Sequence, residues 1–132
     1  MDDADCTVMR TRRDIEERVF KLAANTLRWA RRFRGTYIDR DLVRQLARSV
    51  TSVGAHLEEA RAAETTRDFI HKISVARKEA FEAHYWARLL LIDMDDSVLR
   101  AIRDETDEVA AIVSAIRRNS RATAGRTKKR SD

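Results

Sequence analysis

The chain has 132 residues, a length typical of one domain with a modest hydrophobic core. It contains no proline and only three glycines, so long stretches are free to be helical, and an all-α fold is expected. The only cysteine, Cys6, excludes an internal disulfide. No apolar run reaches membrane-spanning length, and the polar start is unlike a secretory signal. We therefore expect a cytoplasmic protein without a membrane partner.

The net charge of +5 is distributed unevenly along the chain. Residues 14–119 are close to neutral, with 19 cations and 18 anions, whereas residues 120–132 hold five cations and one acid. Within the near-neutral part, residues 18–48 hold nine cations and two acids, and residues 93–108 hold seven acids and two cations. Because attraction to a polyanion depends on where charges cluster, the sequence predicts a polarised surface.

Two amphipathic helices are expected in the first half of the chain. The first covers about 14–35, with Asp14 as N-cap and Glu17 completing a capping box, and the second covers about 39–63 from a start at Asp39 or Asp41. Their apolar seams repeat every three or four residues. These seams are Ile15, Val19, Leu22, Thr26, Trp29 and Phe33, and then Leu42, Leu46, Val50, Val53, Leu57 and Ala60.

Two further helices are expected in the second half. The third covers about 68–92 after an N-cap at Thr65 or Thr66, and the fourth begins at Asp95 or Asp96 and ends at Asn119. Four alanines in the third seam allow a neighbouring backbone to approach closely. The seams are Phe69, Ile73, Ala76, Ala80, Ala83, Ala87 and Leu90, and then Val98, Ile102, Val109, Ile112, Val113 and Ile116.

Three short connections between four helices of similar length predict an antiparallel up-down-up-down four-helix bundle. We divide the chain into a polar N-terminal leader (1–13), the bundle (14–119) and a basic flexible tail (120–132). Apolar residues rotated away from the seams exceed what one bundle interior absorbs, and such faces usually meet another chain. The residues predicted to form an oligomer interface are Phe20, Leu27, Ile70, Phe81, Tyr85 and Ile92.

Several short motifs occur together in a characteristic order. They are Arg48-Ser49, the run from Ser52 to Ala60, Asp68-Phe69-Ile70, Lys78-Glu79-Ala80 with Glu82, Tyr85-Trp86 and Leu89-Leu90. In this combination, residues 14–119 resemble the four-helix-bundle proteins encoded in intervening sequences of bacterial 23S ribosomal RNA genes. The same superfamily includes the accessory variability proteins of diversity-generating retroelements. His56 stands where the family commonly has asparagine, which puts the hydrogen bond of that amide in doubt.

The resemblance implies a ring-shaped homo-oligomer, typically a pentamer, with no known catalysis. For the retroelement branch alone, it also implies binding of nucleic acid or of a reverse transcriptase. A basic C-terminal tail and the helix count are shared with that branch.

A row of polar residues accompanies the seam of the second helix and faces polar groups of the third. We interpret it as a structural network that locks helix register or a subunit boundary. Catalysis would need a nucleophile, a base and an oxyanion donor oriented together, which this spacing does not supply, so no catalytic residue and no enzymatic activity are predicted. The network residues are Ser49, Ser52, His56, Glu59, Glu79, Glu82 and Trp86.

Metal binding is also not predicted. Di-iron bundles use a Glu-x-x-His pair on each of two helices, and none of His56, His71 and His84 has a glutamate three residues before it. We therefore expect no metal and no cofactor.

The cations are the remaining candidates for function, because guanidinium groups at helical spacing suit phosphate oxygens. The alternative is an ordinary solvated surface with local ion pairs. We expect a non-enzymatic oligomeric scaffold that binds RNA or DNA, or a reverse transcriptase, and the alternative is an interaction module without nucleic-acid binding. The predicted phosphate-binding residues are Arg18, Lys21, Arg28 and Arg32, then Arg40, Arg44 and Arg48, and in the tail Arg126, Lys128, Lys129 and Arg130.

Overall fold

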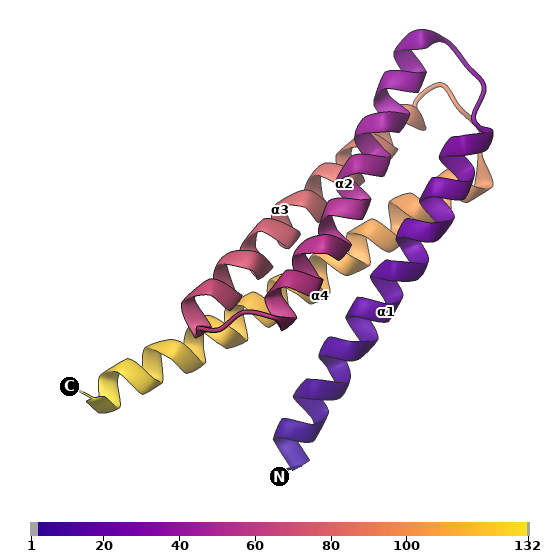
Figure 1. Cartoon of the computed structure of the whole chain (residues 1–132). Helices are drawn as coiled ribbons and strands as arrows, with labels where there is room; N and C mark the ends of the chain where they lie inside the picture. Colours follow the sequence, from indigo (N-terminus) through magenta and orange to yellow (C-terminus); the bar gives the residue numbers. More distant parts are fainter. Residues whose placement is uncertain (1–2, 132) are drawn as a thin grey trace.

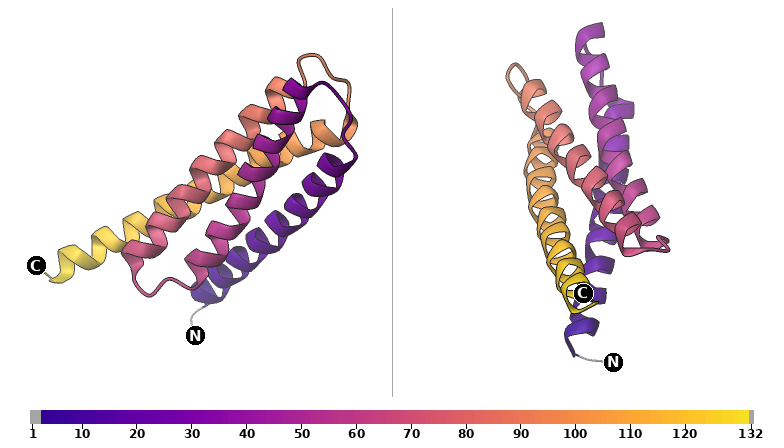
Figure 2. Two further views of the ribbon diagram at one scale, coloured as in Figure 1. Left: turned by 45° about the horizontal axis from the view of Figure 1, so that its top comes forward. Right: turned by 90° about the vertical axis from the view of Figure 1, so that its left-hand side faces the viewer.

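The computed structural model describes residues 3–131, with side chains from residue 13 onward (Figure 1). It contains the four helices α1 (Asp3–Arg32), α2 (Tyr37–Arg61), α3 (Thr66–Leu90) and α4 (Ser97–Ser131). Each helix runs antiparallel to the one before it, and the predicted all-α bundle is confirmed (Figure 2). The helix α3 packs most extensively, against α2 and α4, whereas α1 and α4 meet over a much shorter stretch.

The start of α2 lies slightly before its predicted position. Thr36 is the N-cap residue, with extended backbone, and its hydroxyl accepts a hydrogen bond from the backbone N–H of Asp39 at 3.2 Å. Asp39 therefore lies in the first turn, where its charge complements the helix dipole, and neither Asp39 nor Asp41 is the cap.

The starts of α3 and α4 agree with the predicted capping residues. The hydroxyl of Thr65 accepts a hydrogen bond from the backbone N–H of Asp68 at 3.0 Å. At α4, the Oδ1 atom of Asp96 accepts from the backbone N–H of Leu99 at 2.9 Å. Both caps satisfy helix donors that have no partner within the helix.

The two terminal helices are longer than predicted. The helix α1 begins at Asp3, so Asp14 is an interior residue rather than an N-cap, and α4 continues past Asn119 to Ser131. The sequence contains no proline to stop either extension, and the basic last turn of α4 complements its dipole. Asparagine alone was too weak a signal to end a helix.

The buried row of α4 differs from the predicted one in register. Val98 is 45% exposed, whereas Leu99 is fully buried. Thr106 is also buried, and its hydroxyl donates to the carbonyl of Arg103 at 2.9 Å. With Leu99 and Thr106 included, the buried residues of α4 follow an unbroken spacing of three and four residues. The predicted seam had left both residues out. The row on α4 is Leu99, Ile102, Thr106, Val109 and Val113, with Ile116 packed at its end.

The remaining seams largely follow the prediction. In α1, Thr26 is buried and its hydroxyl donates to the carbonyl of Leu22 at 2.7 Å, while Trp29 and Phe33 are only partly buried. In α2, Val43 is buried in addition to the predicted seam, and Leu42 is partly buried. The alanines of α3 are all buried.

Gly54 lies in the interior of α2, close to α1, and offers a test of this packing. A Cβ atom at Gly54 would lie 3.5 Å from Cγ1 of Val19, which is an ordinary contact. We expect Gly54→Ala to raise the free energy of unfolding by about 0.5–1 kcal/mol, because glycine is a poor helix former. Gly54→Leu should instead lower it by about 1–3 kcal/mol by overpacking against Val19. Urea denaturation measures both, and equal effects of the two variants would contradict the placement of Gly54.

Candidate nucleic-acid interface

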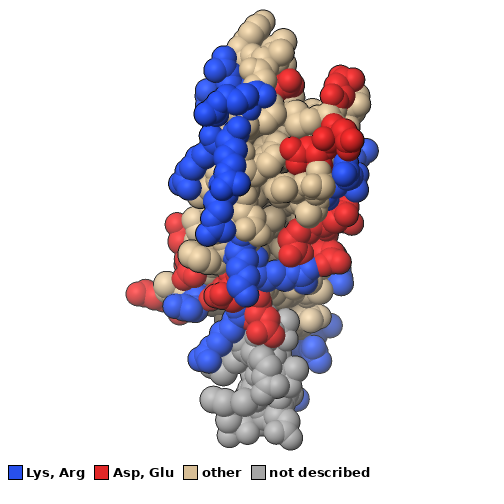
Figure 3. Space-filling model, turned by 90° about the vertical axis from the view of Figure 1, so that its right-hand side faces the viewer, with Lys and Arg blue, Asp and Glu red and all other residues tan. Residues whose placement is uncertain are grey.

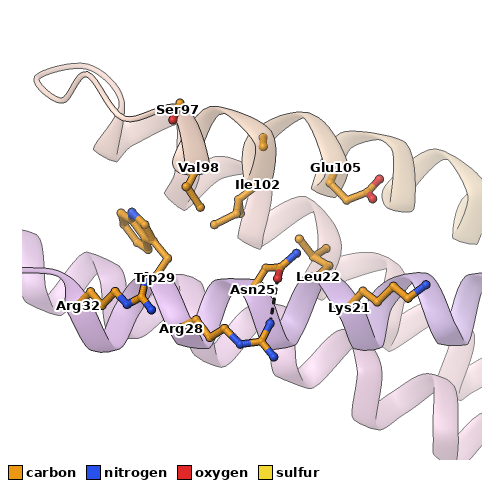
Figure 4. A pocket seen from close by; sticks show the side chains of 11 residues that line it. Lys21, Leu22, Asn25, Arg28, Trp29, Arg32, Ser97, Val98, Ile102 and Glu105 are labelled. Atoms are coloured by element: carbon orange, nitrogen blue, oxygen red, sulfur yellow. Dashed lines mark hydrogen bonds between the residues drawn. The ribbon is translucent and has the colours of Figure 1, made fainter.

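A groove separates α1 from α4 along one side of the bundle, with a cavity volume of about 550 Å³. Figure 4 shows three cations on the α1 wall, Lys21, Arg28 and Arg32, and Glu105 on the α4 wall. The floor between them is apolar. It includes Leu22, Trp29, Val98, Ala101 and Ile102, and Asn25 and Ser97 complete the lining.

Two polar contacts connect the walls of this groove. The indole Nε1 of Trp29 donates to Oδ2 of Asp96 at 2.8 Å, next to the start of α4. Further along α1, the guanidinium of Arg18 donates to Glu105, with Nε at 2.9 Å from Oε1, and to Glu108. These contacts hold α1 against α4 where apolar packing is sparse.

Arg18 therefore differs from the other predicted phosphate ligands. Its hydrogen bond to Glu105, opposed by partial burial, raises the pKa of Arg18 above its ordinary value. Both carboxylates already use its donors, so the structure gives it a bridging position between helices. A phosphate would have to displace two charged partners to reach it.

The exposed cations of α1 are less constrained. Lys21 lies 3.9 Å from Glu17 on its own helix, and Arg28 donates to the amide oxygen of Asn25 at 3.2 Å. Neither Arg28 nor Arg32 forms an ion pair with any described residue. Figure 3 shows Lys and Arg as a column along the α1 side of this face and Asp and Glu grouped on the α4 side. The predicted polarisation of the surface is thus visible across one groove.

The cations of α2 border a different helix. Arg44 pairs with Asp41 at 3.1 Å, and Arg48 reaches Glu82 of α3 at 3.7 Å, while Arg40 is exposed and without an ion pair among the described residues. The structure separates the predicted cations, since Lys21, Arg28 and Arg32 of α1 line the groove with α4, whereas Arg48 of α2 reaches α3.

The predicted tail cations lie on the last turns of α4. Arg126 donates to the carbonyl of Ala122 at 3.4 Å, and Lys128, Lys129 and Arg130 are exposed. Because the helix orders the backbone of these residues, their charges have defined angular positions around α4.

The predicted polar network consists of separate contacts. Within α2, Nδ1 of His56 donates to the carbonyl of Ser52 at 2.8 Å and lies 3.2 Å from its hydroxyl. Between α2 and α3, Glu59 pairs with Lys72 at 3.1 Å. Within α3, Nε1 of Trp86 donates to Glu82 at 3.2 Å. Cross-helix contacts therefore involve cations that the sequence interpretation did not assign to the network.

Two predicted network atoms have no hydrogen-bond partner among the described residues. They are the buried hydroxyl oxygen of Ser49 on α2 and Oε2 of Glu79 on α3. A buried polar group without a partner costs free energy, so these atoms do not stabilise the protomer as a hydrogen-bonded pair.

The residues predicted to form an oligomer interface lie at the surface of the protomer. Phe20 is 70% exposed on α1, and Phe81, Tyr85 and Ile92 are 48–71% exposed on α3 or just after it. Leu27 and Ile70 are half-buried. Three more exposed apolar residues were not predicted at the interface. Tyr37 and Ile38 lie outside the predicted stripes, and Val98 was assigned to the core seam of the fourth helix.

Among the described residues, no group of three or more His, Cys, Asp or Glu side chains is arranged to hold a metal ion. No described helix combines the length and the apolarity needed to cross a bilayer.

These features define an antiparallel four-helix bundle with a charge-polarised groove. The family model for the 23S rRNA-intervening sequence protein matches residues 12–115, and the chain belongs to this family. A protein of unknown function from the S23 ribosomal protein family of Bacteroides thetaiotaomicron has a similar crystal structure, with a TM-score of 0.70. The two are 23% identical over 82% of this chain and 98% of the other, and the likeness concerns the fold. No curated protein matches the chain.

The unpartnered hydroxyl of Ser49 yields a direct prediction. We expect Ser49→Ala to raise the free energy of unfolding by about 1 kcal/mol, since it removes a buried polar atom and introduces a better helix former. Thermal and urea denaturation of the full chain measure the change. Ser52→Ala, at a half-exposed position, is the matched control. A clear loss of stability in Ser49→Ala would show that this hydroxyl is hydrogen-bonded in solution, as the predicted network requires.

Proposed function

We propose that this protein is a non-enzymatic, self-associating scaffold that binds nucleic acid or a partner that processes nucleic acid. The observation that carries the proposal is the row of exposed cations on α1, in which Arg28 and Arg32 have no ion pair among the described residues (Figure 3). A phosphate approaching them does not have to break an existing charge pair.

The geometry of the α1 row suits a repeated anion. Arg28 and Arg32 are four residues apart, which is about 6 Å along the helix at 1.5 Å per residue. Guanidinium forks bind phosphate oxygens through paired hydrogen bonds, and each phosphate that is neutralised releases counterions. The acids of α4 repel the same polyanion, so it would approach the α1 side of the groove rather than the α4 side.

Self-association is supported by the exposed apolar side chains. Phe20, Phe81, Tyr85 and Ile92 are large residues that remain in contact with water in the isolated protomer. Burying them between copies would repeat the cation row around the assembly. Repetition increases avidity for a long polyanion without improving the contacts of one subunit. A homo-oligomer, a pentamer by the family resemblance, is therefore part of the proposal.

The resemblance to accessory variability proteins suggests the partners of the retroelement branch, a reverse transcriptase and its template RNA. The alternative is a structural or protein-interaction module of the family that binds no nucleic acid. It is favoured by the observation that Arg18, Arg44 and Arg48 already pair with carboxylates. Direct binding measurements separate the two functions.

Binding of a fluorescent single-stranded oligouridine to the full chain tests the proposal. We expect wild-type protein to bind at low salt and to lose affinity as salt rises. Arg28→Gln/Arg32→Gln should weaken binding. It should also reduce the slope of log K against the logarithm of the salt concentration by about 1.4, at about 0.7 per lost phosphate contact.

The control for this experiment is Arg61→Gln/Arg100→Gln, which removes the same charge from residues paired with Glu16 and Asp95. Equal losses in both variants would indicate net charge rather than a defined row. Failure of the wild-type protein to bind any oligonucleotide at low salt would favour the alternative module.

Assembly is tested by solution mass. We expect Phe81→Glu and Tyr85→Glu to shift the protein from oligomer to protomer in light scattering, because an interface would bury an unpaired carboxylate. His71→Glu, an exposed position of α3 outside the predicted interface, serves as the control. Helicity by circular dichroism should stay unchanged in all three. An oligomer that persists in both test variants would refute this placement of the interface.

A further inference from the structure

A second group of cations lies where α3 and α4 pack together. The Nε atom of Arg77 on α3 donates to the hydroxyl of Ser114 on α4 at 2.8 Å. In the opposite direction, Nε of Arg117 on α4 donates to the hydroxyl of Ser74 on α3 at 3.0 Å. These reciprocal bonds hold two guanidinium groups on the seam between the helices.

The same seam continues towards the start of α3. Arg121 follows Arg117 by about one helical turn, and it lines a cavity of about 430 Å³ together with Arg67. The rest of that lining is Thr66, Ile70 and Ala124. We call Arg67, Arg77, Arg117 and Arg121 the seam row. None of the four was among the residues predicted to bind phosphate.

The seam row lacks compensating negative charge. Among the described residues, none of its members forms an ion pair. Desolvation, with the neighbouring charges of Arg121 and Arg77, lowers the pKa of Arg117 from its ordinary value. Arg18, between its two glutamates, shows the opposite shift. An arginine nevertheless keeps its charge at neutral pH, so the row is a concentration of fixed positive charge.

The hydrogen bonds of the row leave donors available for a ligand. Arg77 and Arg117 each use Nε for a serine hydroxyl, and their terminal amino groups have no acceptor among the described residues. The guanidinium carbon of Arg77 also lies 4.9 Å from the centre of the Phe81 ring. The serines and the ring therefore orient the guanidinium groups without neutralising them.

We propose that the seam row binds the phosphodiester backbone of single-stranded RNA, an inference that rests on the proposed function and gives it a second site. Four guanidinium groups along one seam, with Arg117 and Arg121 about 6 Å apart along α4, present several phosphate positions, whereas a free phosphate would need only one. Rows of positive charge that track the backbone are typical of proteins that bind single strands without sequence preference, and a single strand can bend to follow such a row.

The last turns of α4 extend this row. Lys128 follows Arg121 by seven residues, which is about two helical turns, so it lies on the same side of α4 beyond the start of α3. The basic end of the chain thus continues a defined row rather than acting alone.

The test compares two row variants of the full chain, using the oligouridine probe at several salt concentrations. Arg67→Gln/Arg121→Gln alters two exposed residues without cross-helix hydrogen bonds, so the fold should be preserved. Arg77→Gln/Arg117→Gln removes the two fixed guanidinium groups. We expect each to weaken binding about 10- to 30-fold at 0.1 M salt and to reduce the salt slope by about 1.4. Arg61→Gln/Arg100→Gln should change affinity less than about twofold.

A further variant separates charge from geometry. Arg67→Lys/Arg121→Lys keeps the charge and should restore the salt slope. Double-stranded RNA should bind more weakly than the oligouridine probe and should lose less affinity in the row variants, because a duplex cannot bend to follow the row.

The outcomes distinguish this inference from the proposed function. If wild-type protein binds, Arg28→Gln/Arg32→Gln weakens binding and both row variants bind like wild type, the seam row is not a site although the proposed function stands. If wild-type protein binds no RNA at low salt, both the seam-row inference and the proposed nucleic-acid binding are wrong. If duplex RNA binds as tightly as the single strand and shows the same losses in the row variants, the assignment to single strands is overturned.

Discussion

The close approach of α3 to both of its neighbours is the packing on which the rest of the molecule depends. Ala76, Ala80, Ala83 and Ala87 are at most 1% exposed and have no side-chain atoms beyond Cβ, so α2 and α4 can come near the α3 backbone. Only at such separations can short side chains interact across helices. The serine–arginine bonds of the seam row and the hydrogen bond from Nδ1 of His84 to the carbonyl of Arg103, at 3.0 Å, follow from this proximity.

The contrast with α1 explains where the groove lies. The later part of the α1 seam contains two large aromatic residues, Trp29 and Phe33, which are only partly buried and contact each other. Polar contacts join α1 to α4, from Trp29 to Asp96 and from Arg18 to Glu105. The result is a groove with a basic wall and an acidic wall, in which Arg28 and Arg32 have no ion pair among the described residues and Arg18 connects the helices.

The two cation rows occupy different environments and therefore differ in what they can contribute. The α1 row is exposed, so it suits long-range, salt-sensitive attraction. Arg77 and Arg117 of the seam row are half-buried and oriented by hydroxyl groups, and Arg77 also by an aromatic ring, so they suit a defined contact geometry. Family membership rests on residues 12–115, which include the hydrogen bond between Arg77 and Ser114 and end just before Arg117.

Periodicity and charge in the sequence were sufficient to identify the helices, the alanine seam and the polarised surface, because these are properties of one helix at a time. The family was indicated by the resemblance of short motifs and not by periodicity or charge. They were not sufficient to show that Leu99 rather than Val98 faces the core, that Arg18 would be paired with Glu105 or that the α1 and α2 cations lie at different helix pairs. The seam row was missed for the same reason, since Arg77 and Arg117 are 40 positions apart and come together only when α3 and α4 pack. The rotation and separation of neighbouring helices decide which side chains meet, and both are set by core packing between helices rather than by the spacing of residues along one of them.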